Sequence, residues 1–240
     1  MRLLRFASLL LALAGATPAL AQKKGKETPA APGPVLPVRL QPLYGGLTPA
    51  QAREVLGAAT LSDIDRSFAS RPEASRFFSQ KGFEYLIENQ SDTAAVRFNL
   101  AWVLDQSNVD AYRGLAVVAS QRPGTPPEAV QSLLLQGLAL APASAPLLAD
   151  AATNTLTRYE QTKKKKDLTA AADFAQRSIA TDSSSYAAWQ ALAHVRYYQE
   201  KYAESWQALH KAQNLNLASF DFQFVTELLA KMPDPEGKYK

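Results

Sequence analysis

The side chains that could do catalytic or metal chemistry are few in this sequence. Its two imidazoles, His194 and His210, lie 16 residues apart on different predicted helices, which favours packing or solvated histidines over metal ligands. The chain has no cysteine, and no serine stands in a Gly-x-Ser-x-Gly elbow. Phosphate-binding glycine loops and dinucleotide fingerprints are also missing. We therefore predict no catalytic residue, no metal ligand and no cofactor.

Charged groups are weaker candidates. Asp63 with Asp65, and Asp234 with Glu236, are carboxylate pairs that could act in acid–base catalysis, but nothing in the sequence around them indicates a pocket. Residues 163–166 are four consecutive lysines that could hold an anionic partner. Because lysine runs in turns are usually solvated, we interpret this run as an exposed loop.

The first 21 residues have the pattern of a secretory signal peptide. Arg2 and Arg5 stand near the start, residues 6–16 form an apolar run, and residues 19–21 read Ala-Leu-Ala, a cleavage pattern. An uncleaved anchor is the alternative, but this apolar run is much shorter than the roughly 20 residues that cross a bilayer. We expect an exported chain, periplasmic or extracellular, that does not span the membrane after cleavage.

The expected mature chain carries little net charge. Without the two arginines of residues 1–21 it has 24 basic residues (26 − 2) against 22 acidic ones, so its net charge falls from +4 to +2. So weak a field on an exported chain argues against nucleic acid as a partner. Without cysteines there are no disulfides, so a hydrophobic core must hold the fold together.

Residues 22–46 are rich in proline. Proline removes backbone donors and favours extended geometry, which predicts a disordered, solvated linker. A proline-rich ligand for another domain is the alternative interpretation.

Helix signals begin in an N-terminal segment at residues 47–74. Thr48 can cap a helix over residues 49–56, with Gln51 closing a capping box. Ser70 and Glu73 have the same spacing at the start of a longer helix. Beyond them almost everything has a helical period and no useful strand period occurs, so we predict an all-α fold.

Residues 186–212 alternate large and small side chains over two predicted helices, about 188–199 and 202–214. Small residues let paired helices approach closely while large ones fill the space between them. The large positions are Trp189, Leu192, Tyr202 and Leu209, and the small ones are Ala193, Ser205 and Ala212. This pattern resembles the tetratricopeptide repeat (TPR), a helix-turn-helix unit of about 34 residues.

The pattern recurs along the chain. The resemblance implies a helix-turn-helix solenoid of four units, residues 75–108, 109–144, 145–185 and 186–219. The third unit needs seven inserted residues, which bring the lysine run. Residues 220–232 are predicted to form a capping helix with Ser219 as its N-cap, followed by a tail at 233–240.

The resemblance also implies a groove lined by the first helix of each unit. The candidate partner-binding residues are Arg76, Ser79, Phe83, Arg113, Val117, Thr153, Gln190, His194 and Tyr197. Arg113 and Gln190 are expected to orient a bound segment, and Tyr197 to anchor it. Packing between repeats explains Phe83 equally well. The lysine and asparagine set of chaperone-binding TPR proteins is not reproduced, so that specificity does not carry over.

These features predict an exported, noncatalytic scaffold that binds a protein or peptide partner in the cell envelope. An envelope-polymer module, for peptidoglycan or polysaccharide, is a second hypothesis that would use the lysine run at 163–166. A third is an accessory subunit of an envelope enzyme complex.

Overall fold

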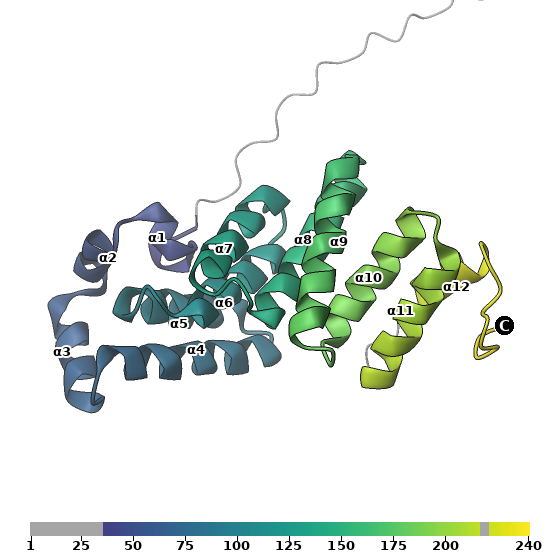
Figure 1. Cartoon of the computed structure of the whole chain (residues 1–240). Coiled ribbons are helices and arrows are strands. Elements are labelled where there is room, and N and C mark those ends of the chain that lie inside the picture. The colour runs from purple at the N-terminus through teal and green to yellow at the C-terminus, as the bar shows by residue number, and fades with distance from the viewer. Residues whose placement is uncertain (1–35, 217–220) are drawn as a thin grey trace, which may run out of the picture. The chain divides into compact units, whose positions relative to one another are not determined.

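The computed structural model describes residues 36–216 and 221–240, and all regular elements in these ranges are helical (Figure 1). In chain order they are a short 3-10 helix (Val38–Leu40), α1 (Leu43–Gly46), α2 (Pro49–Leu56), α3 (Ala58–Ser67), α4 (Arg71–Ile87), α5 (Ser91–Leu104), α6 (Val109–Gln121), α7 (Pro127–Leu140), α8 (Ala145–Thr162), α9 (Lys165–Thr181), α10 (Tyr186–Tyr198), α11 (Tyr202–Leu215) and α12 (Phe222–Leu229). The predicted all-α class is confirmed.

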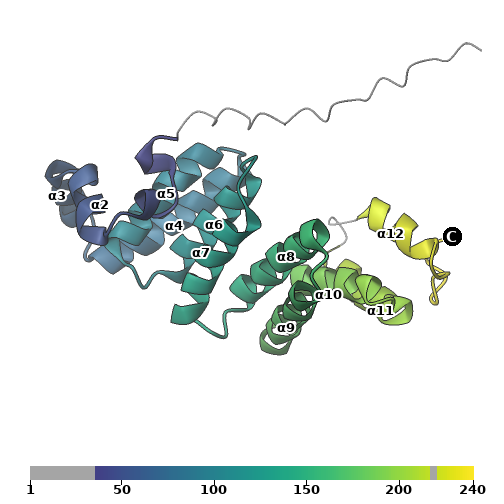
Figure 2. The ribbon, with the colours of Figure 1, turned by 90° about the horizontal axis from the view of Figure 1, so that it is seen from above.

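Helices α4 to α11 form four antiparallel pairs that follow one another in chain order (Figure 2). The second helix of each pair packs on the first helix of the next, as in α5 on α6, α7 on α8 and α9 on α10. Small residues lie at the contacts, as the sequence pattern predicts. Ala94, Ala101, Ala171, Ala193 and Ser205 have no exposed surface. Close approach of the helix backbones at these positions makes the pairs a helical solenoid.

Hydroxyls at small positions also tie helices together. Ser205 of α11 donates to the carbonyl of Ala193 on α10 at 2.8 Å, and Ser178 of α9 donates to the carbonyl of Ala145 on α8 at 2.8 Å. Both serines are fully buried. The hydrogen bonds satisfy a polar group that would otherwise be costly to bury.

The seven extra residues of the third unit lengthen its helices. Helix α8 has 18 residues and α9 has 17, whereas α6 and α10 have 13 each. The α8–α9 pair therefore projects beyond α10 (Figure 1). Arg158 in the added part of α8 bonds the buried carboxylate of Asp167 on α9 at 3.0 Å. This ion pair holds the two extensions together.

The interpretation of the lysine run as one exposed loop is therefore wrong in part. Only Lys163 and Lys164 form the turn, and Lys165 begins α9. The Lys163 ammonium lies 5.4 Å from the ring centre of Tyr159 and 5.3 Å from that of Tyr198. Cation–π attraction thus holds one lysine of the run against aromatic rings.

The N-terminal part of the described chain is ordered from residue 36. The capping box of Thr48 with Gln51 is present and α2 spans the predicted residues. The predicted solvated linker at 22–46 is wrong for 36–46, because Tyr44 is buried and the amide of Asn99 on α5 donates to two carbonyls of this segment at 2.8 and 3.0 Å. Residues 1–35, with the expected signal peptide, lie outside the described residues.

Helix α12 packs against the last repeat through an apolar face. Phe224, Val225 and Leu228 are buried in one cluster with Trp206 of α11. The expected cap Ser219 lies outside the described residues, and the observed cap is Asp221, whose carboxylate accepts from the backbone N–H of Phe224 at 2.9 Å. The cap residue therefore immediately precedes the helix.

A C-terminal tail then folds back onto α11. The indole of Trp206 donates to the carbonyl of Met232 at 3.1 Å, and His210 lies 3.2 Å from Asp234 and 2.9 Å from Glu236. Trp206 is the fully buried tryptophan of this repeat, whereas Trp189, expected in the core, is only half-buried and bonds a loop carbonyl. The tryptophan that fills the core of this repeat is thus Trp206, in the second turn of α11, and not Trp189 of α10.

Candidate binding groove

Three adjoining cavities follow the first helices of units two to four. The first, about 480 Å³, lies between α6, α7 and α8; the second, about 360 Å³, between α8 and α10; the third, about 230 Å³, between α8, α10 and α12. Thr153 and Thr157 line both the first and the second, and Glu160 and His194 line both the second and the third. The shared walls make the cavities one groove.

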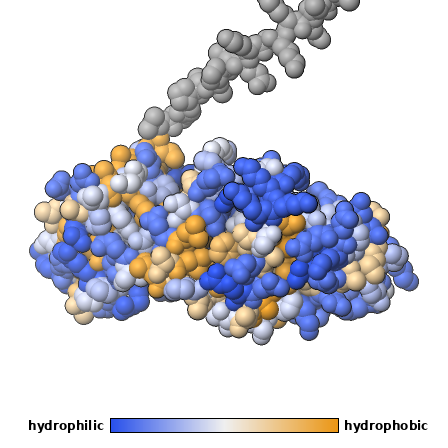
Figure 3. Space-filling model, turned by 45° about the horizontal axis from the view of Figure 1, so that its top comes forward, coloured by the Kyte–Doolittle hydropathy of each residue, from blue (hydrophilic) through white to orange (hydrophobic). Residues whose placement is uncertain are grey.

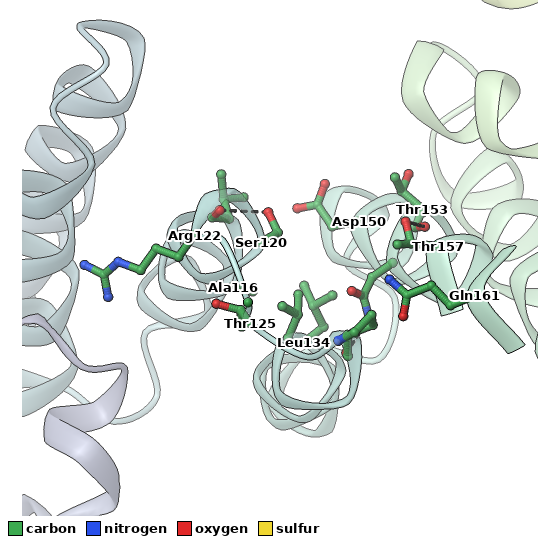
Figure 4. Close-up of a pocket in the computed structure, with 14 residues that line it drawn as sticks. Ala116, Ser120, Arg122, Thr125, Leu134, Asp150, Thr153, Thr157 and Gln161 are labelled. Atoms are coloured by element: carbon green, nitrogen blue, oxygen red, sulfur yellow. Dashed lines mark hydrogen bonds between the residues drawn. The ribbon is translucent and has the colours of Figure 1, made fainter. Parts of the chain in front are cut away.

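The first cavity has an apolar floor and a polar wall. Ala116 and Val117 of α6 and Leu134 of α7 supply the apolar surface, and in Figure 4 Thr153 and Thr157 of α8 lie across the cavity from α6. Figure 3 shows a hydrophobic area where α6 and α7 lie in Figure 1. Hydroxyls next to apolar surface suit a peptide, which offers both backbone polar groups and side chains.

Cations are held away from the first cavity or neutralised there. Arg122 extends away from it (Figure 4) and bonds the carbonyl of Leu40 and, at 2.9 Å, the carboxylate of Asp92. Asp150, in the cavity wall, accepts from Arg113 at 2.7 Å. Burial raises the pKa of Asp150, against the opposing effect of Arg113.

The α12 end of the groove is aromatic and acidic. His194 stacks on Phe224 with ring centres 3.7 Å apart, and its imidazole lies 3.6 Å from Asp221. Burial lowers the pKa of His194. The carboxylates of Asp221, Glu160 and Glu227 oppose this effect without overcoming it. The hydroxyl of Tyr198 donates to Glu160 at 2.9 Å. Burial, followed by this bond, raises the pKa of Tyr198.

The structure brings four of the nine predicted residues together in the groove. Val117 lines the first cavity, Thr153 the first and second, Gln190 the second, and His194 the second and third. They come from three successive first helices, as the repeat register implies.

The other five predicted residues lie outside the groove. Arg76 is exposed on α4; Ser79 is buried and accepts from Asn108 at 2.9 Å; Phe83 packs edge-on against Phe98 with ring centres 4.9 Å apart; Arg113 pairs with Asp150; Tyr197 packs against Phe224 at 5.5 Å. The packing interpretation of Phe83 is thus the one that the contacts support. Tyr197, which was expected to anchor a bound segment, packs against Phe224 of the same chain instead.

Several lining residues were not predicted. Thr157, Glu160 and Gln161 lie toward the end of α8, in or next to the part that the insertion adds, and Asp221 and Glu227 come from α12. The family register has no position for an inserted turn or a capping helix. The insertion itself was the available signal, because an irregular unit changes the surface that it presents.

The candidate chemical groups have structural partners. Asp63 pairs with Arg66, and Asp65 bonds Arg71 at 2.9 Å through two oxygens. In residues 36–216 and 221–240 no group of three or more histidines, aspartates or glutamates could hold a metal ion. Within the same ranges, every helix is too short or too polar to cross a membrane.

Comparisons with known proteins bear on the fold. No family model and no curated protein matches the chain. PilF of Pseudomonas aeruginosa has a similar structure, with a TM-score of 0.54, 23% identity, and coverage of 67% of this chain and 70% of PilF. A MamA structure gives a TM-score of 0.49 at 17% identity, covering 69% of this chain and 86% of MamA. Since PilF is a TPR-repeat protein, the chain has the fold of a TPR-like helical solenoid.

Proposed function

We propose that this protein is a noncatalytic scaffold that binds an extended segment of a protein partner in the groove along α6, α8 and α10. The observation that carries the proposal is the continuity of the groove: Thr153, Thr157, Glu160 and His194 each line two of the three cavities. A compact small molecule would need one closed cavity, whereas a chain of linked cavities suits an extended peptide.

The lining of the groove supports a peptide ligand. The exposed hydroxyls of Thr153 and Thr157 donate to helix carbonyls and can still accept from a peptide backbone, and the half-buried amide of Gln190 can bond it too. The apolar floor of the first cavity can receive a side chain. These residues stand on regular helices whose positions are set by buried contacts, so the groove is preorganised.

Obstruction of the groove tests this function. Thr153 and Thr157 are exposed on α8, and a Thr153→Arg, Thr157→Arg variant would fill the passage between the first two cavities. Thr169→Arg on α9 is the matched control, because Thr169 is also exposed and also bonds the carbonyl four residues before it.

The measurement is a selection of random 12-residue displayed peptides on the immobilised full chain. We expect peptides that bind the parent and the Thr169→Arg control but not the double variant, with unchanged circular dichroism. Peptides that bind all three forms equally would refute a role for the groove. The earlier candidates Arg113 and Tyr197 are poor probes, because Arg113 pairs with Asp150 and Tyr197 packs against Phe224.

We also propose that the protein acts outside the cytoplasm, in the periplasm or extracellular space. The support is the pattern of residues 1–21, with early arginines, an apolar run and a small-residue cleavage pattern. Mass spectrometry of the protein from cells should give a mature chain that begins at Gln22. A chain that retains residues 1–21 would contradict export by cleavage.

The envelope-polymer hypothesis depends on the lysines at the projecting end of α8 and α9. Lys164, Lys165 and Lys166 are exposed there, so they could contact an anionic polymer. Sedimentation with purified cell wall, repeated with these three lysines changed to glutamine, separates the two proposals. Sedimentation that depends on these lysines, without groove-dependent peptides, would favour the polymer.

A further inference from the structure

The α12 end of the groove differs in charge from the rest. Among the residues that the structure describes, the third cavity is lined by the carboxylates of Glu160, Asp221 and Glu227 and by no lysine or arginine. Glu160 accepts from Tyr198 and Glu227 accepts from Gln223 at 2.9 Å, both neutral donors. Neither of these hydrogen bonds pairs a carboxylate of the cavity with a cation.

His194 does not neutralise this end. Its imidazole is the one basic group that residues 36–216 and 221–240 contribute to the lining of the third cavity, and it lies 3.6 Å from the carboxylate of Asp221. Burial lowers its pKa below the usual 6.5, so the imidazole is mostly uncharged at neutral pH. Glu160 and Glu227 also oppose that shift, and the shift remains. At pH 7 the cavity thus presents net negative charge.

A separate contact shows that this end already attracts a cation. Tyr159 and Tyr198 stand with ring centres 5.1 Å apart, and the ammonium of Lys163 lies 5.4 and 5.3 Å from them. Tyr198 is also in the wall of the third cavity. This lysine belongs to the chain itself, and one ring of the aromatic pair that it contacts, Tyr198, donates its hydroxyl to Glu160 of the cavity.

The inserted turn of the third unit builds this end. Tyr159 and Glu160 belong to the part of α8 that extends beyond the length of α6 and α10. The opposite wall comes from α12, where Asp221 caps the helix and so points its carboxylate at the N-terminus. Both acidic walls are thus features of this chain rather than of the repeated unit.

The geometry points to a lysine or arginine side chain of the bound segment seated in the third cavity, between Glu160, Asp221 and Glu227, with small or apolar residues of that segment over α6 and α7. This inference depends on the proposed peptide-binding function. A cavity of about 230 Å³ has room for one such side-chain end. Two or three carboxylates around a cation give charge-assisted hydrogen bonds, the stronger class.

The test begins with the sequences of the selected 12-residue peptides that bind in a groove-dependent manner. We expect lysine or arginine to be enriched over the starting library at one position relative to the apolar residues. A fluorescein-labelled enriched peptide, and a copy with norleucine at that position, are then titrated against the full chain by anisotropy. The norleucine copy should bind about tenfold more weakly.

Matched variants locate the effect. Glu227→Gln removes one charge from an exposed position of α12, and Glu54→Gln removes one from an exposed position of α2 that is not in the groove. The preference for the basic peptide should shrink several-fold in Glu227→Gln and persist in Glu54→Gln.

The outcomes separate the two proposals. Groove-dependent peptides without basic enrichment, or an equal loss in both glutamine variants, would overturn the cation pocket and leave the peptide groove standing. A failure to obtain any peptide sensitive to Thr153→Arg with Thr157→Arg would overturn the groove itself, and the cation pocket with it.

Discussion

The ring of Phe98 lies against two glycines, Gly82 and Gly114, and this close packing allows a quantitative prediction. The ring of Phe98, on α5, is fully buried between α4 and α6. A Cβ on Gly114 of α6 would lie 2.1 Å from one ring carbon and 2.3 Å from two others. Ordinary carbon contacts are about 3.5 Å or longer, so the ring or the helix would have to move by more than about 1 Å. Gly82 and Phe83 leave the ring little room to move.

We expect Gly114→Ala to destabilise the protein by about 1–2 kcal/mol. Overpacking costs about 1–3 kcal/mol, and a contact of 2.1 Å belongs in the upper part of that range, about 2–3 kcal/mol. The higher helix propensity of alanine offsets about 1 kcal/mol of this cost. Gly137→Ala is the matched control, because its Cβ would meet the terminal methyl of Leu147 at 2.9 Å, the end of a flexible side chain. It should be nearly neutral.

Chemical denaturation of a double-mutant cycle with Phe98→Leu measures the cause. In the Phe98→Leu background the ring is gone, so Gly114→Ala should cost little or stabilise, a coupling of about 1–3 kcal/mol. Effects of Gly114→Ala that add to those of Phe98→Leu within about 0.5 kcal/mol would refute the reasoning. The cost of Gly114→Ala would then come from somewhere other than the ring.

Three further results follow from the last repeat. Trp206→Ala should cost about 3–5 kcal/mol by denaturation and expose the tail to proteolysis, since it opens a cavity and removes the bond to Met232; an unchanged midpoint would contradict this. Ala212→Leu should cost about 1–3 kcal/mol, because Ala212 is buried at a helix contact, and a neutral effect would mean that the register is wrong. The pKa of His194, measured by NMR titration, should lie below 6.5, and it should be lower still in Asp221→Asn. The free energy of unfolding should fall as the pH falls through about 6.5, because the unfolded chain binds a proton at this imidazole before the folded chain does. A midpoint at or above 6.5 would refute the burial argument.

The tail adds a pH dependence at the acidic end. Burial would raise the pKa of Asp234, but hydrogen bonds from the backbone N–H groups of Glu236, Tyr239 and Lys238, with the charge of His210, lower it. Because the pKa of Asp234 is lowered in the folded protein, the ionised carboxylate stabilises the fold at any pH above 3.8, the usual pKa of the group. This stabilisation is lost as the pH falls through the pKa of the folded protein. The protection of the tail amides from hydrogen exchange, corrected for the intrinsic pH dependence of exchange, should therefore fall below about pH 4 before the protection of α10 and α11 does. Asp234→Asn should remove this difference, and a tail that exchanges with the helices at every pH would contradict it.

Local sequence determined the helices and their pairing. The size alternation at positions such as Ala193, Ser205 and Ala212 depends on steric contact between adjacent helices of one unit, so it could be read from spacing alone. The capping box of Thr48 and Gln51 is equally local, because both groups belong to one turn. The order at residues 36–46 was missed, because it depends on Asn99, far along the chain.

Only the tertiary structure decided the groove and its charge. From the sequence, Val117, Thr153, Gln190 and His194 could be assigned to the correct face, since the repeat register gives the direction of a helix position. Whether Arg113 and Tyr197 are free to bind a partner depends on their contacts with Asp150 and Phe224. These two residues belong to other helices, and the repeat register does not predict the contacts. The acidic end likewise needs α8 to be lengthened and α12 to fold back beside it. Contacts between elements distant in sequence have no period or spacing by which the sequence alone could reveal them.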